Sequence, residues 1–314
     1  MFNWFFYLRT NNIIYDKLKY LKTHYKLLET LQLSKTTNVY KVIEKKSKKI
    51  IILKTLNLND NIYDKLSLIN LKNEYLLLKK INHTNIIKPI EFIENFGISL
   101  NYYPSYELFF YINNNWLLIQ EKLTLFHKLI NILQYLHKLP IYHLDLKLEN
   151  ILINSEKEPL LIDFGNSTRQ KQTSRKGTYV YLPPEFNNNE TVNSSKIDSW
   201  CLGLILLALI NDNLFFKWIS NEKSFKNYNK LKNKLYQINQ TNQINQTNQT
   251  NQTNQTNQTN QTNQTNQTNQ TNQTNQNAKI ILMNYLEDLW VWEPQNRKAL
   301  IDLKIINDLD NINT

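Results

Sequence analysis

The chain has 314 residues, of which 41% are hydrophobic and 12% are aromatic, which is enough to bury one large core or two modest ones. No run of about 18 apolar residues occurs, and the apolar residues 1–8 lack the basic segment and the cleavage site of a secretory signal, so we expect no membrane span and no secretion. The single cysteine excludes an internal disulfide and a cysteine metal site, which indicates an intracellular protein of the cytoplasm.

The net charge of +11 would permit binding to nucleic acid or to an anionic membrane. Lysine, asparagine and isoleucine are over-used throughout the chain, however, as expected of an AT-rich coding sequence. We therefore attribute the charge to composition and expect no nucleic-acid partner.

The predicted elements divide the chain into two parts, one with strand-like and one with helix-like hydrophobic patterns. Between residues 25 and 111, β-branched and aromatic runs at 39–43, 50–53, 86–93 and 98–103 predict short strands, with one helix around 63–81. From residue 117 onward, apolar residues recur at helical spacing over 123–139, 197–210 and 280–292. The sequence thus predicts a small sheet carrying one helix, followed by a mainly helical part.

One segment differs from all others in composition. Residues 237–277 are almost entirely Asn, Gln and Thr, with ten consecutive Thr-Asn-Gln triplets from 247 to 276. With almost no apolar side chains to bury, such a tract cannot compensate for its ordering entropy. We expect it to be a disordered insert.

Four motifs follow one another in the second half of the chain: HLDLKLEN at 143–150, DFG at 163–165, GTYVYLPPE at 177–185 and DSWCLG at 198–203. The first matches the catalytic loop H-R-D-L-x-x-x-N at all fixed positions but one, and the second is the metal-binding D-F-G. In this order and spacing they resemble the eukaryotic protein kinase family, and Lys147 and Thr178 match its serine/threonine branch. The resemblance implies an α+β, two-lobed protein-kinase-like fold with a small β-rich N-lobe and a larger, mainly α-helical C-lobe.

The resemblance also implies a domain organisation. An N-terminal extension at 1–24 would precede a kinase domain at 25–309, with the N-lobe at about 25–100, the hinge at about 101–107 and the C-lobe at about 108–309 containing the insert. A protein substrate with a Ser or Thr hydroxyl and the cofactors ATP and Mg²⁺ are implied as partners. The sequence does not indicate an oligomeric state.

The family pattern assigns roles to particular residues. Lys54 would position the ATP phosphates. Its ammonium needs a carboxylate to hold it toward them, and Glu74, 20 residues later on the predicted helix, would be that partner. Asp145 would orient the substrate hydroxyl and accept its proton, and Lys147 would neutralise the γ-phosphate. Lys54 and Glu74 belong to the expected nucleotide site through the phosphates. The other residues expected in this site are Val39, Ile52, Leu100, Tyr102 and Glu107. Asn150 and Asp163 would hold magnesium, and Glu185 with Arg297 would form a structural ion pair.

Three departures from the family pattern leave two functions open. Gln32, Ser34 and Thr37 stand where the glycine-rich loop has glycines, Ile52 stands where an alanine normally lies against adenine, and Leu144 replaces the arginine that pairs with a phosphorylated activation loop. The first hypothesis is an active serine/threonine kinase with weakened nucleotide affinity. The alternative is a pseudokinase acting as a binding or scaffolding module. We favour the enzyme, because all the catalytic residue types survive.

Overall fold

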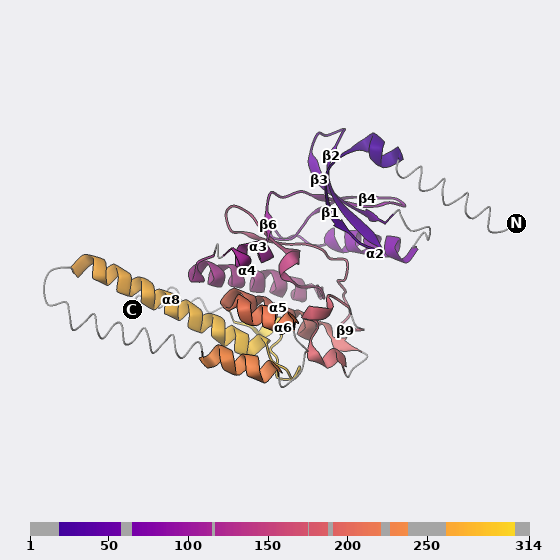
Figure 1. The fold of residues 1–314 in the computed structure, drawn as a ribbon. Coiled ribbons are helices and arrows are strands. Elements are labelled where there is room, and N and C mark those ends of the chain that lie inside the picture. Colours follow the sequence, from indigo (N-terminus) through magenta and orange to yellow (C-terminus); the bar gives the residue numbers. More distant parts are fainter. Residues whose placement is uncertain are drawn as a thin grey trace. The chain divides into compact units, whose positions relative to one another are not determined.

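The computed structural model describes residues 19–57, 65–114, 117–174, 176–187, 191–220, 227–237 and 262–304. The chain forms two compact units (Figure 1). Unit 1 contains residues 1–105, 154–156 and 160–165, and unit 2 contains the remainder. In the described ranges, no helix combines the length and the apolarity that a bilayer crossing requires.

Unit 1 is a five-stranded antiparallel sheet with one main helix, α2 (Lys65–Leu78). In spatial order the strands are β1 (Tyr25–Leu33), β2 (Thr37–Glu44), β3 (Ile50–Leu56), β5 (Gly97–Asn101) and β4 (Pro89–Ile93). A buried core covers one face of the sheet, and it consists of Tyr25, Val42, Ile51, Leu53, Ile93 and Phe96. Tyr20 and Leu21 pack against this core, so the last residues of the predicted 1–24 extension belong to unit 1. Residues 1–18 lie outside the described part of the chain.

Unit 1 also takes in residues that the sequence analysis assigned to the second lobe. Leu161, at the end of β8 (Pro159–Leu161), forms a parallel bridge with Ile86. Its backbone N–H donates to Asn85 at 2.9 Å, and its carbonyl accepts from Ile87 at 3.0 Å. These backbone bonds attach the segment up to Gly165, and with it the D-F-G motif, to unit 1. The chain passes from unit 1 to unit 2 after Ser105, inside the stretch predicted as the hinge.

Unit 2 is mainly helical. Its α-helices are α3 (Leu108–Asn113), α4 (Ile119–Lys138), α5 (Ser194–Ile210), α6 (Asp212–Ser220), a helix over 227–237 and α8 (Thr262–Leu289). Its short strands are β6 (Tyr106–Glu107), paired with β7 (Ile151–Ile153), and β9 (Gln172–Thr173), paired with β10 (Val192–Asn193). The 3-10 turns are η1 (Leu148–Asn150), η2 (Tyr179–Tyr181), η3 (Pro184–Asn187) and η4 (Leu300–Asp302).

The central helix of unit 2 is α5. Asn193 caps its N-terminus by accepting from the backbone of Ser195 at 3.0 Å and Lys196 at 3.4 Å. Fourteen of its 17 residues are buried, so it is apolar on every side and lies in the interior. Its Trp200 lies edge-on to Trp218 and near Trp290, which makes a buried tryptophan cluster. The predicted two-lobed α+β fold is confirmed.

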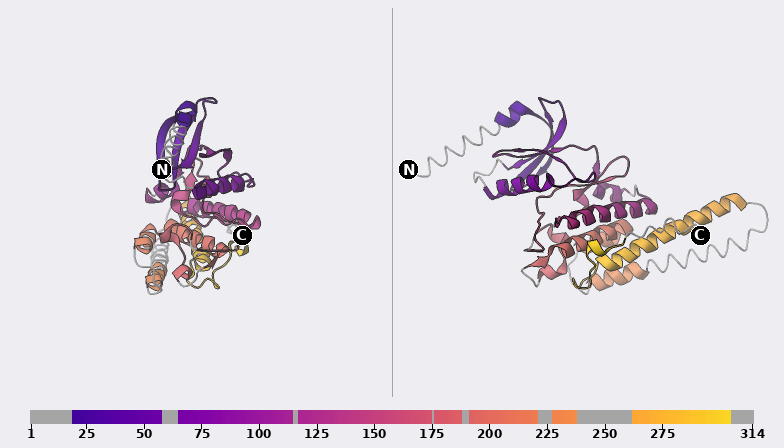
Figure 2. Two further views of the ribbon diagram at one scale, coloured as in Figure 1. Left: turned by 90° about the vertical axis from the view of Figure 1, so that its right-hand side faces the viewer. Right: turned by 180° about the vertical axis from the view of Figure 1, so that it is seen from behind.

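Helix α8 includes part of the Asn/Gln/Thr segment at 237–277 that was predicted to be a disordered insert. A helix over 227–237 ends at residue 237, and α8 begins at Thr262. Residues 262–277 are therefore helical in the structure, while 238–261 lie outside the described residues. The anchor is the buried stretch from Ala278 to Leu289, and extending an existing helix costs far less than starting one. Gln120 supports the extension by donating to the carbonyl of Thr274 at 2.7 Å. Figure 2 shows the first turns of α8 extending beyond the other helices of unit 2.

Candidate active site

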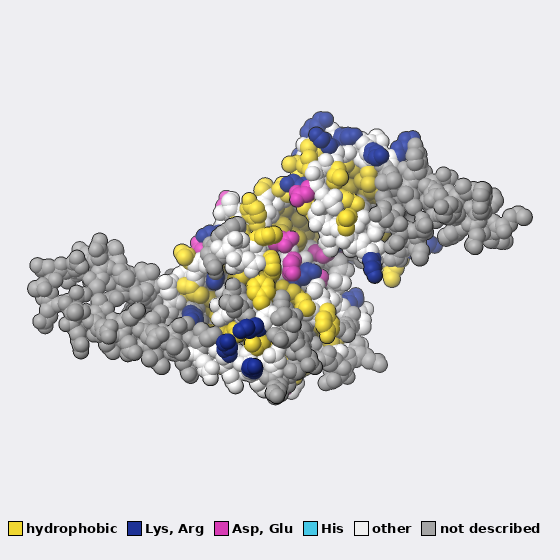
Figure 3. All heavy atoms as spheres, viewed as in Figure 1, with side chains coloured by type: hydrophobic (Ala, Val, Ile, Leu, Met, Phe, Trp, Pro, Cys, Tyr) yellow, Lys and Arg dark blue, Asp and Glu magenta, His cyan; other side chains and the backbone are white. Residues whose placement is uncertain are grey.

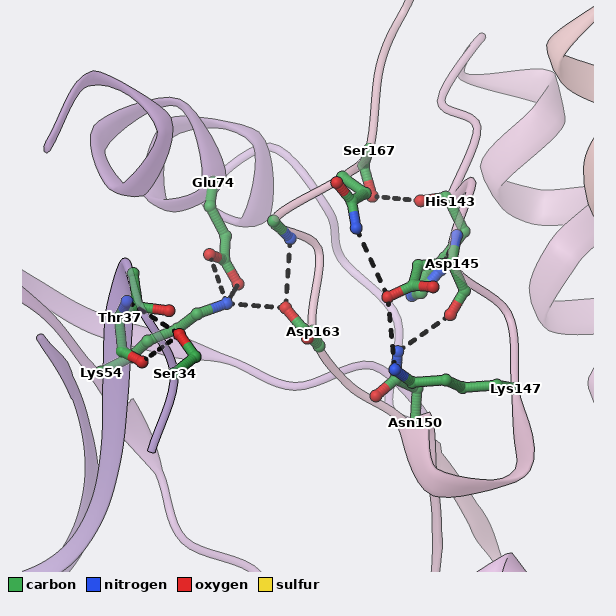
Figure 4. Close-up of polar contacts among 12 residues, drawn as sticks. Ser34, Thr37, Lys54, Glu74, His143, Asp145, Lys147, Asn150, Asp163 and Ser167 are labelled. Carbon is green, nitrogen blue, oxygen red and sulfur yellow. Dashed lines mark hydrogen bonds and ion pairs between the residues drawn. The ribbon is translucent and has the colours of Figure 1, made fainter. Parts of the chain in front are cut away.

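In unit 1, a buried lysine is held between two carboxylates (Figure 4). Lys54 Nζ on β3 lies 2.8 Å from Glu74 Oε2 on α2 and 2.6 Å from Asp163 Oδ1. It also donates to Glu74 Oε1 at 3.0 Å. The predicted residues Lys54, Glu74 and Asp163 are thus brought together, with Glu74 reaching inward from the buried side of α2.

The charge state of this cluster follows from its contacts. Burial alone would lower the pKa of Lys54, but the carboxylates of Glu74 and Asp163 outweigh burial and raise it. The ammonium is therefore kept charged. Asp163 has a φ of 60°, a left-handed conformation that aspartate tolerates better than most residues. Its Oδ1 also accepts from the backbone N–H of Gly165 at 3.3 Å.

The register of the sheet places four predicted nucleotide contacts on one face. Val39 is opposite Lys54, and Ile52 is opposite Leu100. Directly opposite residues point to the same face of a sheet, and alternate residues of one strand do so as well. This face is the one opposite the buried core. Lys41 is opposite Ile52, and its ammonium lies 4.5 Å from the ring centre of Tyr102, a cation–π distance.

The glycine-free loop is closed by a serine hydroxyl. Ser34 Oγ accepts from the backbone N–H of Thr37 at 3.0 Å and donates to the carbonyl of Thr37 at 2.6 Å (Figure 4). Asn57 donates from its side chain to the carbonyl of Ser34 at 2.8 Å. No described residue from 32 to 37 has a positive φ. The loop therefore turns without glycine, and side-chain hydrogen bonds hold it in place.

In unit 2, Asp145 is the centre of a second polar cluster. Its Oδ1 accepts from the backbone N–H of Thr178 at 2.8 Å and from its hydroxyl at 2.7 Å. Lys147 Nζ lies 3.5 Å from Asp145 Oδ2 and donates to Thr178 Oγ1 at 3.0 Å. Gly177, with a φ of 100°, makes this approach possible, because a Cβ there would lie 2.3 Å from the carbonyl oxygen of Leu144. Asp145 is buried with one carboxylate oxygen anchored and the other beside Lys147.

The loop carrying Asp145 is fixed from below by Asp198 of α5. Its carboxylate accepts from the backbone N–H groups of His143 at 2.9 Å and Leu144 at 2.8 Å, and it lies 2.9 Å from His137 Nε2. Leu144 has a φ of 64°, an unfavourable conformation for leucine that these bonds stabilise. His143 Nδ1 accepts from the backbone N–H of Asp145 at 3.3 Å. His143 is thus a buried packing residue beneath Asp145.

Asn150 in unit 2 and Asp163 in unit 1 each offer an oxygen atom of the kind that magnesium binds. Asn150 donates from Nδ2 to the carbonyl of Asp145 at 2.9 Å. Its amide oxygen therefore points away from that carbonyl. Asp163 offers a carboxylate whose side chain is one-third exposed. Oxygen ligands of these two kinds are those that magnesium prefers. Among the described residues, no three or more His, Cys, Asp or Glu side chains form a cluster that could hold a metal ion.

Three further predicted residues are located in unit 2. Glu107 on β6 is half-buried, and burial raises its pKa, with Glu149 adding to the increase and Lys147 opposing it. Glu185 and Arg297 form the expected buried ion pair, at 2.8 and 3.2 Å. The guanidinium of Arg297 also lies 4.8 Å from the ring centre of Trp200.

Two residues that contact this site were not predicted from the sequence. Asn166 donates from Nδ2 to Asp145 Oδ2 at 3.4 Å, and the signal available in the sequence was its place directly after D-F-G. His137 contacts Asp198, and it lies within an apolar helical repeat that gave no sign of a polar role. Both contacts join residues that are distant in sequence, so spacing could not indicate them.

Comparison with known proteins identifies the class. A profile of the protein kinase domain matches residues 25–303, so the chain belongs to the protein kinase domain family. This confirms the resemblance inferred from the motifs.

Three relatives illustrate the similarity. The chain is 31% identical over 198 residues, 60% of its length and 30% of the relative's, to NUAK family SNF1-like kinase 1 of Mus musculus. It is 29% identical over 204 residues, 62% and 32% of the two lengths, to NUAK family SNF1-like kinase 2 of Pongo abelii. The third relative, of Enterocytozoon bieneusi, is named "Probable serine/threonine-protein kinase KIN1 homolog". The chain is 29% identical to it over 213 residues, which cover 64% of the chain and 35% of the relative. The chain spans about a third of the length of these relatives.

Proposed function

We propose that the chain is an active serine/threonine protein kinase that transfers the γ-phosphate of ATP to a protein hydroxyl. The observation that carries the proposal is the intact pairing of Lys54 with Glu74 and Asp163. A pseudokinase has no need of a buried ammonium held between two carboxylates, which is costly to assemble. The names of the matched relatives support the choice of serine/threonine substrates.

The proposed mechanism assigns one task to each residue. The substrate hydroxyl oxygen attacks the γ-phosphorus, the bond from phosphorus to the bridging oxygen of ADP breaks, and Asp145 accepts the hydroxyl proton. The Thr178 contacts orient the Asp145 carboxylate. Lys54 would hold the α- and β-phosphates, and Lys147 would neutralise the γ-phosphate. Magnesium, held by Asn150 and Asp163, would supply charge neutralisation on the phosphate oxygens.

The remaining predicted contacts would form the nucleotide site. Val39, Ile52, Leu100 and Tyr102 would surround adenine, and Glu107 would reach the ribose. Ile52 adds bulk on the face that also carries Lys54, and the Ser34 hydrogen bonds hold the phosphate loop rigid. Both features would weaken the binding of ATP. They would not abolish it, because neither removes a charged side chain that contacts ATP.

Two assays test the proposal. Magnesium-dependent ATP binding is measured by thermal shift, and transfer of labelled phosphate to a generic basic protein is then measured. Asp145→Ala should keep the thermal shift and lose about a hundredfold or more of the transfer rate. A chain that binds ATP but transfers at the rate of Asp145→Ala would favour the pseudokinase. Transfer by Asp145→Ala at the parent rate would contradict the mechanism.

A further inference from the structure

The positive charge of the chain is concentrated in one short stretch of unit 1. Residues 19–49 contain nine lysines against two glutamates, a net +7 out of the +11 of the whole chain. A composition bias acting evenly along the chain would not place most of the net charge in about a tenth of its length. The stretch therefore calls for an explanation of its own.

The structure presents five of these lysines together. The lysine tip consists of Lys22, Lys45, Lys46, Lys48 and Lys49, all exposed. Four of them occupy the turn between β2 and β3, and Lys45 Nζ donates to the carbonyl of Lys22 at 2.5 Å, which joins the fifth to them. Figure 3 shows Lys and Arg side chains gathered at this end of unit 1.

The lysine tip is ordered by its backbone. The N–H of Glu44 donates to the carbonyl of Lys49 at 2.9 Å, and the N–H of Lys48 donates to the carbonyl of Glu44 at 2.8 Å. Lys48 takes the left-handed conformation with a φ of 63° that completes the turn. A closed turn presents its charges with little further loss of backbone entropy on binding.

The charges of the lysine tip are not used inside the protein. In the described ranges, none of its five ammonium groups lies within ion-pair distance of a carboxylate, whereas Lys41, Lys128 and Lys157 each form such a pair. Neighbouring like charges repel one another. An anionic partner would relieve this repulsion.

Exposed aliphatic side chains flank the lysine tip. Ile50 follows Lys49 directly and is 41% exposed, and Leu27 and Leu28 on β1 are 58% and 42% exposed. Lysine beside exposed aliphatic side chains is typical of interfacial membrane-binding segments.

We propose that the lysine tip binds the surface of an anionic phospholipid bilayer, with Ile50, Leu27 and Leu28 contacting the headgroup boundary. The five lysines would supply the electrostatic attraction, and the apolar side chains would supply the second contribution that stable peripheral binding requires. Nucleic acid fits less well, because the exposed apolar residues beside the lysine tip are aliphatic and cannot stack on bases.

The test measures co-sedimentation of the full chain with vesicles of phosphatidylcholine, with and without about one-third phosphatidylserine. The tip variant replaces Lys45, Lys46, Lys48 and Lys49 by Gln. A matched control replaces four exposed lysines elsewhere, Lys79, Lys80, Lys138 and Lys234, by Gln, and so removes the same charge. A milder variant, Lys46→Gln with Lys49→Gln, leaves the contact of Lys45 and the conformation of Lys48 intact. It keeps the test valid if the fourfold tip variant fails to fold.

The parent and the control should bind the phosphatidylserine vesicles, and the tip variant should lose about tenfold or more in partitioning, with the milder variant in between. Raising the salt concentration should release the parent chain. An equal loss in the tip variant and the control would overturn the proposal in favour of net charge alone. Absence of vesicle binding by the parent would also overturn it, as would binding to a labelled single-stranded oligonucleotide in preference to vesicles. None of these outcomes depends on phosphotransfer.

Discussion

Lys54 balances two carboxylates, so its removal should affect stability as well as activity. In Lys54→Met, Glu74 and Asp163 would face each other without a cation, and an uncompensated buried charge costs about 3 kcal/mol. We expect the variant to lose phosphate transfer and to melt several degrees lower. The measurements are the transfer rate and the melting temperature.

A second substitution separates these two effects. Lys54→Met combined with Glu74→Gln removes one of the two carboxylates that repel each other, so the double variant should regain part of the lost melting temperature while staying inactive. Recovery of activity in the double variant would show that Lys54 does not contact the phosphates. No change of melting temperature in the single variant would contradict the energetic role argued from its burial.

Arg297 offers a parallel test at a site without a chemical role. It pairs with Glu185 in the interior of unit 2 and also donates to the carbonyl of Val291 at 2.8 Å. Arg297→Met should cost about 3 to 5 kcal/mol of unfolding free energy, because Glu185 would be left buried and unpaired. Adding Glu185→Leu should recover much of this loss in a thermal melt. If the double variant is less stable than the single one, the carbonyl contacts of Arg297 matter more than the ion pair.

At the scale of elements, the loop between β1 and β2 governs how closely backbone can approach a nucleotide. Ser34 holds this loop through its hydroxyl, and the residues at 32, 34 and 37 all carry side chains. Replacing all three by glycine removes these bonds and allows a tighter turn. The Michaelis constant for ATP should fall, by about threefold to tenfold if one hydrogen bond to phosphate is gained. The matched control, alanine at the same three positions, should not lower it.

The elements also show how far sequence reasoning reaches. The contact of Lys54 with Glu74 and Asp163 could be expected from the spacing of the motifs, while the roles of these residues and of Asp145 in phosphate transfer stay predictions. The start of α8 was not predictable, because Asn, Gln and Thr carry no helix signal and the helix extends from the packed segment after Ala278. The attachment of the D-F-G segment to unit 1 depends on backbone bonds of Leu161, which side-chain patterns do not encode.

For the whole molecule, two half-buried histidines give the stability a pH dependence. Burial lowers the pKa of His83, with the charge of Lys88 adding to the effect, and burial lowers the pKa of His127. The folded chain then binds fewer protons than the unfolded chain near pH 6, so the unfolding free energy falls as the pH drops through about 6.5. The melting temperature should fall less between about pH 7 and pH 5.5 in His83→Gln/His127→Gln than in the parent. Equal falls would show that other groups dominate.

The last prediction concerns the Asn/Gln/Thr tract, which the molecule should tolerate without needing. Its helical part, residues 262–277, has the Gln120 contact to Thr274 as a tertiary hydrogen bond, worth about 1 kcal/mol. The packed part of α8 lies beyond it, where Leu282 and Leu289 are completely buried. Deleting residues 247–261 only shortens a connection, at about 0.6 kcal/mol per halving of its length. This deletion should leave both activity and melting temperature unchanged.

Extending the deletion over residues 240–276 removes the Thr274 contact as well, so the melting temperature should fall by no more than about 4 °C. Leu282→Ala is the contrasting variant, because a cavity in the packed part of α8 should cost about 2 to 5 kcal/mol. The expected order of melting temperatures is therefore the parent and the short deletion together, then the long deletion, then Leu282→Ala. A long deletion that destabilises the chain as much as Leu282→Ala would mean that the tract itself packs against unit 2, and its position as a tolerated extension of α8 would have to be abandoned.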